Sequence, residues 1–320
     1  MSVFTVVSRA QVADFLSRYA VGDLIDYEGI QSGIENSNYF VSTTTGRFVL
    51  TVFEFLSPAS LQKYLELMLE LSAAGLPTAQ PMQTTDGALQ QILCKKPAAL
   101  VERLQGKSIE QVSAAHCACV GNMLARLHTA TTSFDPTLTL ERDKRWQQQA
   151  VAALSEQFDR SEKKGLGEYF DAADVFSDRS LPTGLIHTDL FRDNVLFENG
   201  SLSGLIDFYS ACRGPYIYDL AVVLLDWCYD NANRLCPTAA RSLVTGYAAV
   251  REFTETEHQA WHRALQAAAA KFWISRQYDF SFPREGAVIT TKDPSRFGDI
   301  FRQLNAEFPS LSMPGASARR

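Results

Sequence analysis

The residue types that could do chemistry are concentrated between residues 185 and 208. An apolar run there leads into a polar loop that holds Asp189 and Asn194, and a second apolar run leads to Asp207. A carboxylate in such a loop can accept the proton of a hydroxyl group, and a carboxylate together with an amide oxygen can hold a magnesium ion on phosphates. These residues therefore predict the transfer of a phosphoryl group from a nucleotide to a hydroxyl group.

The spacing of these residues resembles the catalytic loop and metal motif of aminoglycoside phosphotransferase and choline kinase-like enzymes, which are relatives of the protein kinases. The motif in this chain is His187-x-Asp189-x-x-x-x-Asn194, followed after a second apolar run by Asp207. The resemblance implies that Asp189 is the catalytic base, that Asn194 and Asp207 are metal ligands, and that His187 braces the loop. A lone His-x-Asp would also fit a metal-hydrolase fragment or a capped turn, but three motifs in this order favour the phosphotransferase.

Two further acidic residues near this stretch have other interpretations. Asp219 follows a Gly-Pro pair, and that segment resembles the one after the metal ligand in the same family. The resemblance implies that Asp219 is a buried structural carboxylate that contacts the catalytic loop. Asp193 lies inside the loop itself and is interpreted as a solvent-exposed or turn-forming residue.

The composition is that of an ordinary soluble globular protein, with 46% hydrophobic and 21% charged residues among 320. A net charge of −6 makes nucleic acid an unexpected partner, because proteins that neutralise phosphates along a duplex are usually basic. The sequence shows neither a secretory signal nor an apolar stretch that would span a membrane, so the cytoplasm is expected. The six cysteines contain no Cys-x-x-Cys pair, which favours reduced thiols over disulfides or zinc.

The elements that must position the polar loop come in an unusual order, with β-strands first and helices after them. This order, with the resemblance, predicts an α+β protein-kinase-like fold in two lobes. The small β-rich N-lobe covers residues 1–102, and the larger, mainly helical C-lobe covers residues 103–320. Strands are expected at residues 24–30, 37–43, 47–53, 89–93 and 98–103, with one strand pair between 185 and 208. Helices are expected at residues 12–19 (capped by Ser8 and ended by Gly22), 58–74, 108–128 (capped by Ser108), 146–158, 166–176 and 260–278, and residues 314–320 are expected to form a disordered tail.

The predicted N-lobe has places for ATP. The loop between the first two strands includes Asn36, Ser37 and Asn38, whose amides and short side chains can bind phosphate oxygens. Residues Val101, Glu102 and Arg103 occupy the place of the inter-lobe hinge, where kinase-like folds bind adenine through backbone groups.

The third predicted strand departs from the kinase pattern. Thr51 stands where these enzymes usually carry the lysine for the ATP phosphates, and the strand contains no lysine. Lys63 lies in the next helix, where Glu66 and Glu70 are the candidates for the helical glutamate partner. Either another cation or backbone amides do this work, or the chain is a catalytically silent relative.

These departures themselves resemble one branch of the family, the bacterial homoserine kinases that are built on this fold. The resemblance covers nearly the whole chain and is strongest between residues 185 and 230. It rests on Gly33-x-Glu35-Asn36-Ser37-Asn38-Tyr39, Leu50-Thr51-Val52-Phe53-Glu54, Lys96-Pro97-Ala98-Ala99-Leu100, Leu205-Ile206-Asp207-Phe208-Tyr209 and Phe272-Trp273-x-Ser275-Arg276. It implies ATP and Mg²⁺ as cofactors, and the phosphorylation of L-homoserine to O-phospho-L-homoserine in threonine biosynthesis.

A pocket for homoserine needs a cation for the carboxylate, oxygens for the ammonium and an apolar wall for the methylenes. The candidates are Tyr209, Asp226, Trp227, Trp273 and Arg276, of which Arg276 could hold the carboxylate in a fork. Two other functions stay open: a kinase for choline, methylthioribose or an aminoglycoside, and an ATP-binding pseudokinase. The sequence leaves open the oligomeric state, any feedback regulation and the choice between magnesium and manganese.

Overall fold

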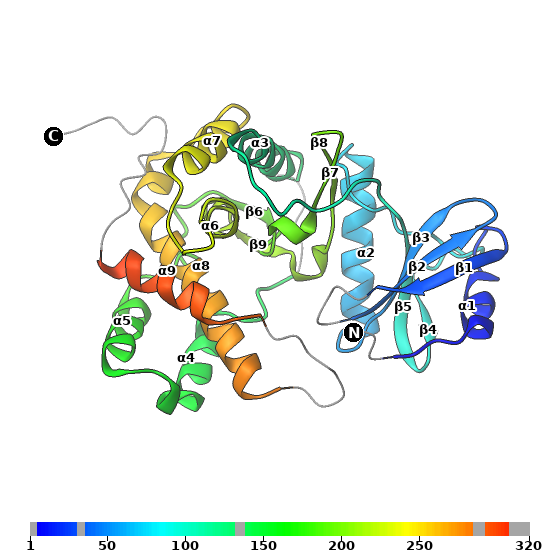
Figure 1. The fold of residues 1–320 in the computed structure, drawn as a ribbon, viewed down its shortest axis with the longest axis horizontal. Helices are drawn as coiled ribbons and strands as arrows, with labels where there is room; N and C mark the ends of the chain where they lie inside the picture. Colours follow the sequence, from blue (N-terminus) through cyan, green and yellow to red (C-terminus); the bar gives the residue numbers. More distant parts are fainter. Residues whose placement is uncertain (1–4, 31–35, 132–137, 284–291, 307–320) are drawn as a thin grey trace. The chain divides into compact units, whose positions relative to one another are not determined.

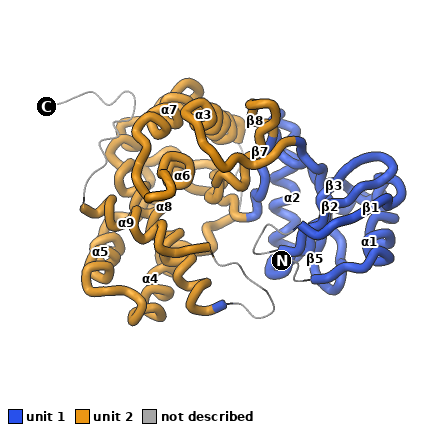
Figure 2. The backbone as a smooth tube through the Cα atoms, in the orientation of Figure 1, with its two compact units in different colours: residues 1–105, 204–209, 283–291 blue, residues 106–203, 210–282, 292–320 orange. Residues whose placement is uncertain are grey.

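The computed structural model describes residues 5–30, 36–131, 138–283 and 292–306 (Figure 1). The chain forms two compact units (Figure 2). The first comprises residues 1–105, 204–209 and 283–291, and the second comprises residues 106–203, 210–282 and 292–320. The short segment that contains Asp207 therefore groups with the first unit, although it follows the catalytic loop in the sequence. The expected lobe boundary after residue 102 stays a prediction.

The first unit is built on an antiparallel five-stranded sheet with the order β1-β2-β3-β5-β4. Its strands are β1 (Leu24–Gly29), β2 (Ser37–Thr43), β3 (Arg47–Val52), β4 (Gln91–Leu93) and β5 (Lys96–Glu102), and its helices are α1 (Arg9–Leu16) and α2 (Pro58–Ala73). The predicted strands and the helix that starts at Pro58 are confirmed. So is the capping box of α1, in which Ser8 and Gln11 satisfy each other's backbone N–H groups. The prediction that this helix extends to Gly22 is wrong, because α1 ends at Leu16.

The two faces of this sheet have different surroundings. Tyr39, Val41, Leu50 and other residues of one face are buried in a core with the apolar side of α1. The opposite face carries Asn38 and Phe40 of β2, which alternate with those buried residues and are only half-buried. Thr51 lies opposite Asn38 in the register of β2 and β3. One face of the sheet is thus buried in the core, and the other is half-buried and carries the polar Asn38 next to the aromatic Phe40.

The second unit is mainly helical. Its helices are α3 (Ala114–Ala130), α4 (Lys144–Ala153), α5 (Arg160–Asp171), α6 (Tyr216–Trp227), α7 (Pro237–Ala248), α8 (Glu255–Ser281) and α9 (Ser295–Ala306). Strand β6 (Thr183–Ile186) pairs with β9 (Cys212–Pro215), and β7 (Val195–Glu198) pairs with β8 (Ser201–Leu205) across a turn at Asn199 and Gly200. Both turn residues have positive φ, at 50° and 79°, as a tight hairpin requires. All residues of α6 are buried, and Figure 1 shows this helix end-on among the other helices of the unit.

Several predictions for this unit need correction. The cap of α3 is Ser113 and not Ser108, because Ser113 forms a capping box with His116. The two-stranded sheet β6–β9 adds to the single strand pair expected here, and α4 and α5 lie earlier in the chain than predicted. The tail expected at residues 314–320 lies outside the described residues. Within the described parts of the chain, no helix is both long enough and apolar enough to cross a membrane.

Helices α3 and α7 approach each other closely because each places a glycine at the contact. A Cβ atom added to Gly121 would lie 2.1 Å from the carbonyl oxygen of Leu243, and one added to Gly246 would lie 2.2 Å from that of Ala118. Both distances are far below a van der Waals contact, and the obstructing atoms belong to backbone. Any side chain at these positions would push the two helices apart.

We expect Gly246→Ala to lower the free energy of unfolding by about 1–3 kcal/mol, the usual cost of overpacking. Gly167→Ala is the matched control, since Gly167 lies in α5 with no atom within 4 Å of an added Cβ. There the change should stabilise the protein by roughly 0.5–1 kcal/mol, because alanine favours the helix. Urea unfolding of both variants measures the difference, and equal stabilities would contradict the close α3–α7 contact.

Candidate active site

The catalytic loop begins where β6 ends, and a buried carboxylate holds its first residues. Asp219 of α6 accepts the backbone N–H of His187 at Oδ2 and that of Thr188 at Oδ1, both at 2.7 Å. Asp219 and His187 are completely buried. Burial raises the pKa of Asp219, but hydrogen bonds from His128 and the backbone outweigh it and hold the pKa below its usual value. An ionised Asp219 therefore fixes the direction in which the loop leaves the strand.

Thr188 is held in an unfavourable backbone conformation. Its φ is 65°, in the left-handed region that β-branched residues rarely adopt. Its N–H is bound by Asp219, and its hydroxyl donates to the carbonyl oxygen of Ser210 at 2.9 Å. Strain of this kind costs about 1–3 kcal/mol and persists only where the surroundings over-determine the geometry. The position of the next residue, Asp189, depends on this strained residue.

Asn194 stabilises the loop through hydrogen bonds to Asp189. Its Nδ2 donates to the main-chain oxygen of Asp189 at 2.8 Å and, at 3.4 Å, to the side-chain Oδ2. The N–H of Asp189 donates weakly to Nδ1 of His187 at 3.3 Å. Both side-chain bonds of Asn194 within the described residues use its nitrogen, so the amide oxygen Oδ1 accepts no hydrogen bond from them. The loop thus offers an oriented carboxylate and an available amide oxygen.

Asp207 belongs to the first unit and has its own unusual backbone. Its φ is 66°, and its side chain is exposed. Aspartate tolerates this conformation better than most residues, because its short polar side chain can bond locally. Its carboxylate, like the amide oxygen of Asn194, is of the hard-oxygen type that magnesium prefers.

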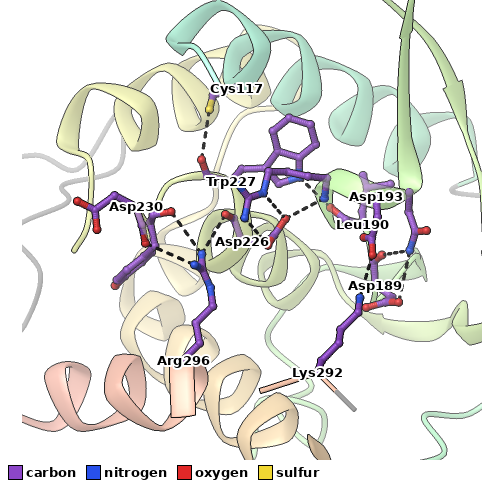
Figure 3. Close-up of polar contacts among 12 residues, drawn as sticks. Cys117, Asp189, Leu190, Asp193, Asp226, Trp227, Asp230, Lys292 and Arg296 are labelled. Atoms are coloured by element: carbon purple, nitrogen blue, oxygen red, sulfur yellow. Dashed lines mark hydrogen bonds and ion pairs between the residues drawn. The ribbon is translucent and has the colours of Figure 1, made fainter. Parts of the chain in front are cut away.

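Two neighbouring residues at the end of α6, Asp226 and Trp227, form hydrogen bonds to the middle of the loop (Figure 3). Asp226 accepts the backbone N–H of Arg192 at 2.8 Å and its Nε at 3.2 Å. The indole N–H of the buried Trp227 donates to the carbonyl oxygen of Leu190 at 3.0 Å. Two of the predicted substrate residues, Asp226 and Trp227, thus make contacts that support the loop.

Arg276 is a half-buried cation near the loop. Its guanidinium lies 4.5 Å from the ring centroid of Phe297. Among the described residues it donates one hydrogen bond, to the carbonyl oxygen of Asp293, which is long at 3.4 Å. Burial lowers its pKa, and the charges of Asp226 and Asp189 act in the opposite direction. No carboxylate of the described residues forms an ion pair with it. The guanidinium therefore retains donors for a ligand.

Three further residues singled out in the sequence lie in different surroundings. Asp193 is exposed and forms an ion pair with Lys292 at 2.8 Å, as Figure 3 shows. Trp273 is buried, with its ring against Phe158 and Phe301. Tyr209 belongs to the first unit, where its ring lies edge-on to that of Phe53, and burial raises its pKa. Neither aromatic residue has a described hydrogen bond to the loop of Asp189.

In the first unit, the polar residues at the start of β2 are engaged with β3 and the segment after it. Thr51 donates its hydroxyl hydrogen to Oδ1 of Asn38 at 2.7 Å, which leaves the Nδ2 of Asn38 without a partner among the described residues. Ser37 donates to Glu54 at 2.6 Å, and Asn36 accepts the N–H of Glu54 at 3.4 Å. Strand β3 has no lysine, so Thr51 orients an amide where the kinase pattern has a cation.

The predicted hinge residues at the end of β5 are also partly engaged. The N–H of Glu102 donates to the carbonyl oxygen of Gln80 at 2.9 Å, and the N–H of Arg103 donates to the carbonyl oxygen of Arg47 at 3.1 Å. The guanidinium of Arg103 lies 3.7 Å from the ring centroid of Phe40. A ligand at this strand end would use other backbone groups or compete with these bonds. In α2, Lys63, Glu66 and Glu70 are exposed and make no ion pair within the described residues.

Sequence reasoning missed the basic residues that surround the loop in the second unit. Arg192 pairs with Asp226, and Arg296 donates to the carbonyl oxygens of Asp226, Tyr229 and Asp230 at 3.3–3.4 Å. The position of Arg192 inside the loop, next to Asp193, was a signal, but its partner Asp226 lies 34 residues away in the sequence. The carbonyl oxygens bound by Arg296 lie at and after the end of α6, where a cation is favoured.

The comparisons with known proteins agree with this arrangement. The model of the phosphotransferase enzyme family matches residues 26–253. A homoserine kinase of Methylobacillus flagellatus is 40% identical over 94% of this chain and 95% of its own length. That of Neisseria meningitidis serogroup B is 40% identical over 95% of this chain and 100% of its own length.

Solved structures show the same fold at low sequence identity. The structure of an amicoumacin kinase in complex with AMP-PNP, Ca²⁺ and Ami has a TM-score of 0.72 at 14% identity, and the match covers 95% of both chains. A spectinomycin phosphotransferase in complex with ADP and spectinomycin has a TM-score of 0.66 at 14% identity, with 93% of this chain and 95% of that chain covered. The predicted protein-kinase-like fold is confirmed.

We expect Trp227→Phe to destabilise the protein more than Trp261→Phe, by about 1–3 kcal/mol. Both indoles are buried, but only Trp227 has a hydrogen-bond partner in the described residues, so its loss leaves the carbonyl oxygen of Leu190 unsatisfied. Both changes remove the same side-chain atoms, so the loss of packing contributes about equally to the two free energies of unfolding and cancels in their difference. Denaturant unfolding measures both, and equal losses would show that the bond does not hold the loop.

Proposed function

This chain belongs to the phosphotransferase enzyme family and, within it, to the homoserine kinases, and from that premise we propose the reaction and the residues that perform it. The γ-phosphoryl group of ATP is transferred to the side-chain hydroxyl of L-homoserine, which gives ADP, O-phospho-L-homoserine and a proton. The single observation that carries the reaction type is the loop in which the Asn194 amide donates to the main-chain oxygen and to Oδ2 of Asp189. This intact arrangement, with the near full-length relatives, disfavours the pseudokinase and the kinases for other alcohols.

Asp189 is the proposed catalytic base. Phosphoryl transfer to an alcohol needs a group that orients the hydroxyl and takes its proton as the new bond forms. The bond from Asn194 to Oδ2 of Asp189 orients the carboxylate that would meet the substrate hydroxyl. His187 and Asp219 are proposed to act indirectly, by positioning the backbone of the loop. Asp219 binds the N–H groups of His187 and Thr188, and His187 accepts the N–H of Asp189.

Magnesium is the proposed metal, with Asn194 and Asp207 as its protein ligands. The free Oδ1 of Asn194 and the exposed carboxylate of Asp207 fit a small hard cation, which is satisfied by one or two protein oxygens, water and phosphate. Bound there, the ion would neutralise charge on the phosphates.

The nucleotide is proposed to lie on the half-buried face of the first unit's sheet. Asn38 and its neighbours Asn36 and Ser37 would meet the phosphates, and the backbone of Val101, Glu102 and Arg103 would meet the adenine. Thr51 binds the oxygen of the Asn38 amide and thereby presents its nitrogen as the donor. A neutral amide would then donate a hydrogen bond to the phosphates in place of the missing lysine, and the metal would supply the positive charge that balances them.

Arg276 is the proposed partner of the homoserine carboxylate. It is half-buried, lies within the electrostatic influence of Asp189, and has no carboxylate partner among the described residues. A guanidinium can bind a carboxylate through two parallel bonds, which fixes orientation as well as charge. Asp226 and Trp227 are better placed to support the loop than to touch the substrate. Tyr209 and Trp273 keep at most an apolar role in this proposal.

A panel of alcohols tests the proposed substrate. We expect kcat/KM for L-homoserine to exceed that for L-serine by on the order of 10²-fold, because the serine hydroxyl stops about 1 Å short once the carboxylate is clamped. Choline lacks the carboxylate and would leave Arg276 unpaired, and kanamycin is the aminoglycoside control. The measurement is coupled ADP release at saturating Mg·ATP. If homoserine ranked below any of the other three, the proposed substrate would be wrong.

A further inference from the structure

A row of buried polar side chains continues from the back of the catalytic loop to the start of α8. Asp219, which binds the loop backbone, lies 3.1 Å from Nε2 of His128. Nδ1 of His128 lies 2.8 Å from the hydroxyl of Tyr247, and that hydroxyl lies 3.3 Å from Arg251. Arg251 forms a two-bond ion pair with Glu257, at 2.9 and 3.2 Å. Four helices, α3, α6, α7 and α8, and the loop after α7 thereby meet in one network.

The hydrogen bonds of this row can run in only one direction. An ionised Asp219 only accepts, so Nε2 of His128 must carry the hydrogen. A neutral imidazole has a single N–H, which leaves Nδ1 as an acceptor and makes the hydroxyl of Tyr247 its donor. The same hydroxyl oxygen then accepts from Arg251, which has only donors. Each group therefore fixes the role of the next.

The protonation states agree with this direction. Burial lowers the pKa of His128, and its bond to Asp219, which acts the other way, does not offset this. Burial raises the pKa of Tyr247, so the phenol keeps its hydrogen. A neutral imidazole thus lies between an anionic carboxylate and a protonated phenol.

Packing couples the row to the strand that enters the loop. The ring of Tyr216 stacks on His128 with 4.4 Å between the ring centroids, and the guanidinium of Arg251 lies 4.8 Å from the same ring. The hydroxyl of Tyr216 would lie 2.1 Å from a Cβ added to Gly184 in β6. Movement of this cluster would therefore displace β6 and the loop that follows it.

We propose that His128 and Tyr247 are positioning residues for phosphoryl transfer, which hold the carboxylate of Asp219 in the orientation that keeps Thr188 left-handed and Asp189 in place. The kinetic consequence rests on the proposed function. Neither residue contacts a ligand in this account, so their loss lowers kcat and leaves both KM values nearly unchanged. Arg251 and Glu257 anchor the far end of the row, where Glu257 also accepts the N–H of Thr254 at the start of α8.

The test compares Tyr247→Phe with Tyr218→Phe. Each change removes one hydroxyl oxygen from a tyrosine that is 1% exposed, but the hydroxyl of Tyr218 has no hydrogen-bond partner in the described residues. Tyr247→Phe should lower kcat for L-homoserine about tenfold, the effect of one buried hydrogen bond, with each KM within about twofold of the unaltered protein. Tyr218→Phe should leave kcat unchanged. A purely structural role for Tyr247 would lower the melting temperature and leave kcat of the folded enzyme unchanged.

Amide hydrogen exchange gives a readout that needs no substrate. In Tyr247→Phe the N–H groups of His187 and Thr188 should exchange faster than in Tyr218→Phe, whereas equal exchange together with equal kcat would overturn the proposal. If the unaltered protein did not phosphorylate homoserine, the proposed function would fail, and the exchange comparison alone would decide the positioning role.

Nitrogen-15 spectra of the histidine-labelled protein add a test without Tyr247 variants. They should show His128 as the Nε2–H tautomer, and an Nδ1–H tautomer would overturn the proposal.

Discussion

Two backbone N–H groups donate to the buried carboxylate of Asp219, and the geometry of the catalytic loop depends on these bonds. They hold Thr188 in a conformation that its β-branched side chain disfavours, and that conformation determines where the carboxylate of Asp189 lies. A buried carboxylate is costly unless donors surround it. Asp219 has three such donors in the backbone of His187 and Thr188 and the imidazole of His128. The loop and its anchor therefore stabilise each other.

Charge is distributed unevenly around the proposed reaction. The first unit offers neutral donors, since Thr51 orients the amide of Asn38 and Lys96 is paired with Glu54. Neutral hydrogen bonds are about half as strong as charge-assisted ones, so the proposed metal would carry more of the phosphate charge than in kinases with the strand lysine. The second unit supplies the opposite kind of group in Arg276, a half-buried guanidinium without a described carboxylate partner. This cation suits the carboxylate of an amino-acid alcohol.

Features that depend on neighbouring residues were predictable from the sequence, and features that depend on distant residues were not. The capping box of Ser8, the turn at Asn199-Gly200 and the loop from Asp189 to Asn194 are all local patterns. Ser108 also has a glutamine three residues later, yet α3 starts after Ser113, which forms its capping box with His116, so the local pattern did not distinguish the two serines. The role of His128 was hidden, since its partners Asp219 and Tyr247 lie 91 and 119 residues away. Resemblance to a family supplied the roles that spacing alone left open.

The central claim is that Asp189, and no other carboxylate of the loop, takes the proton of the substrate hydroxyl. The most direct measurement is kcat for L-homoserine in Asp189→Asn and in Asp193→Asn, which differ only in which loop carboxylate becomes an amide. Asp189→Asn should fold normally and lose roughly 10²–10⁴-fold in kcat, the usual contribution of a general base. Asp193→Asn should stay within about threefold of the unaltered protein, because the ion pair that it weakens, with Lys292, is exposed and no other side-chain bond of Asp193 is found within the described residues. Near-normal turnover in Asp189→Asn, or an equal loss in both variants, would contradict the account.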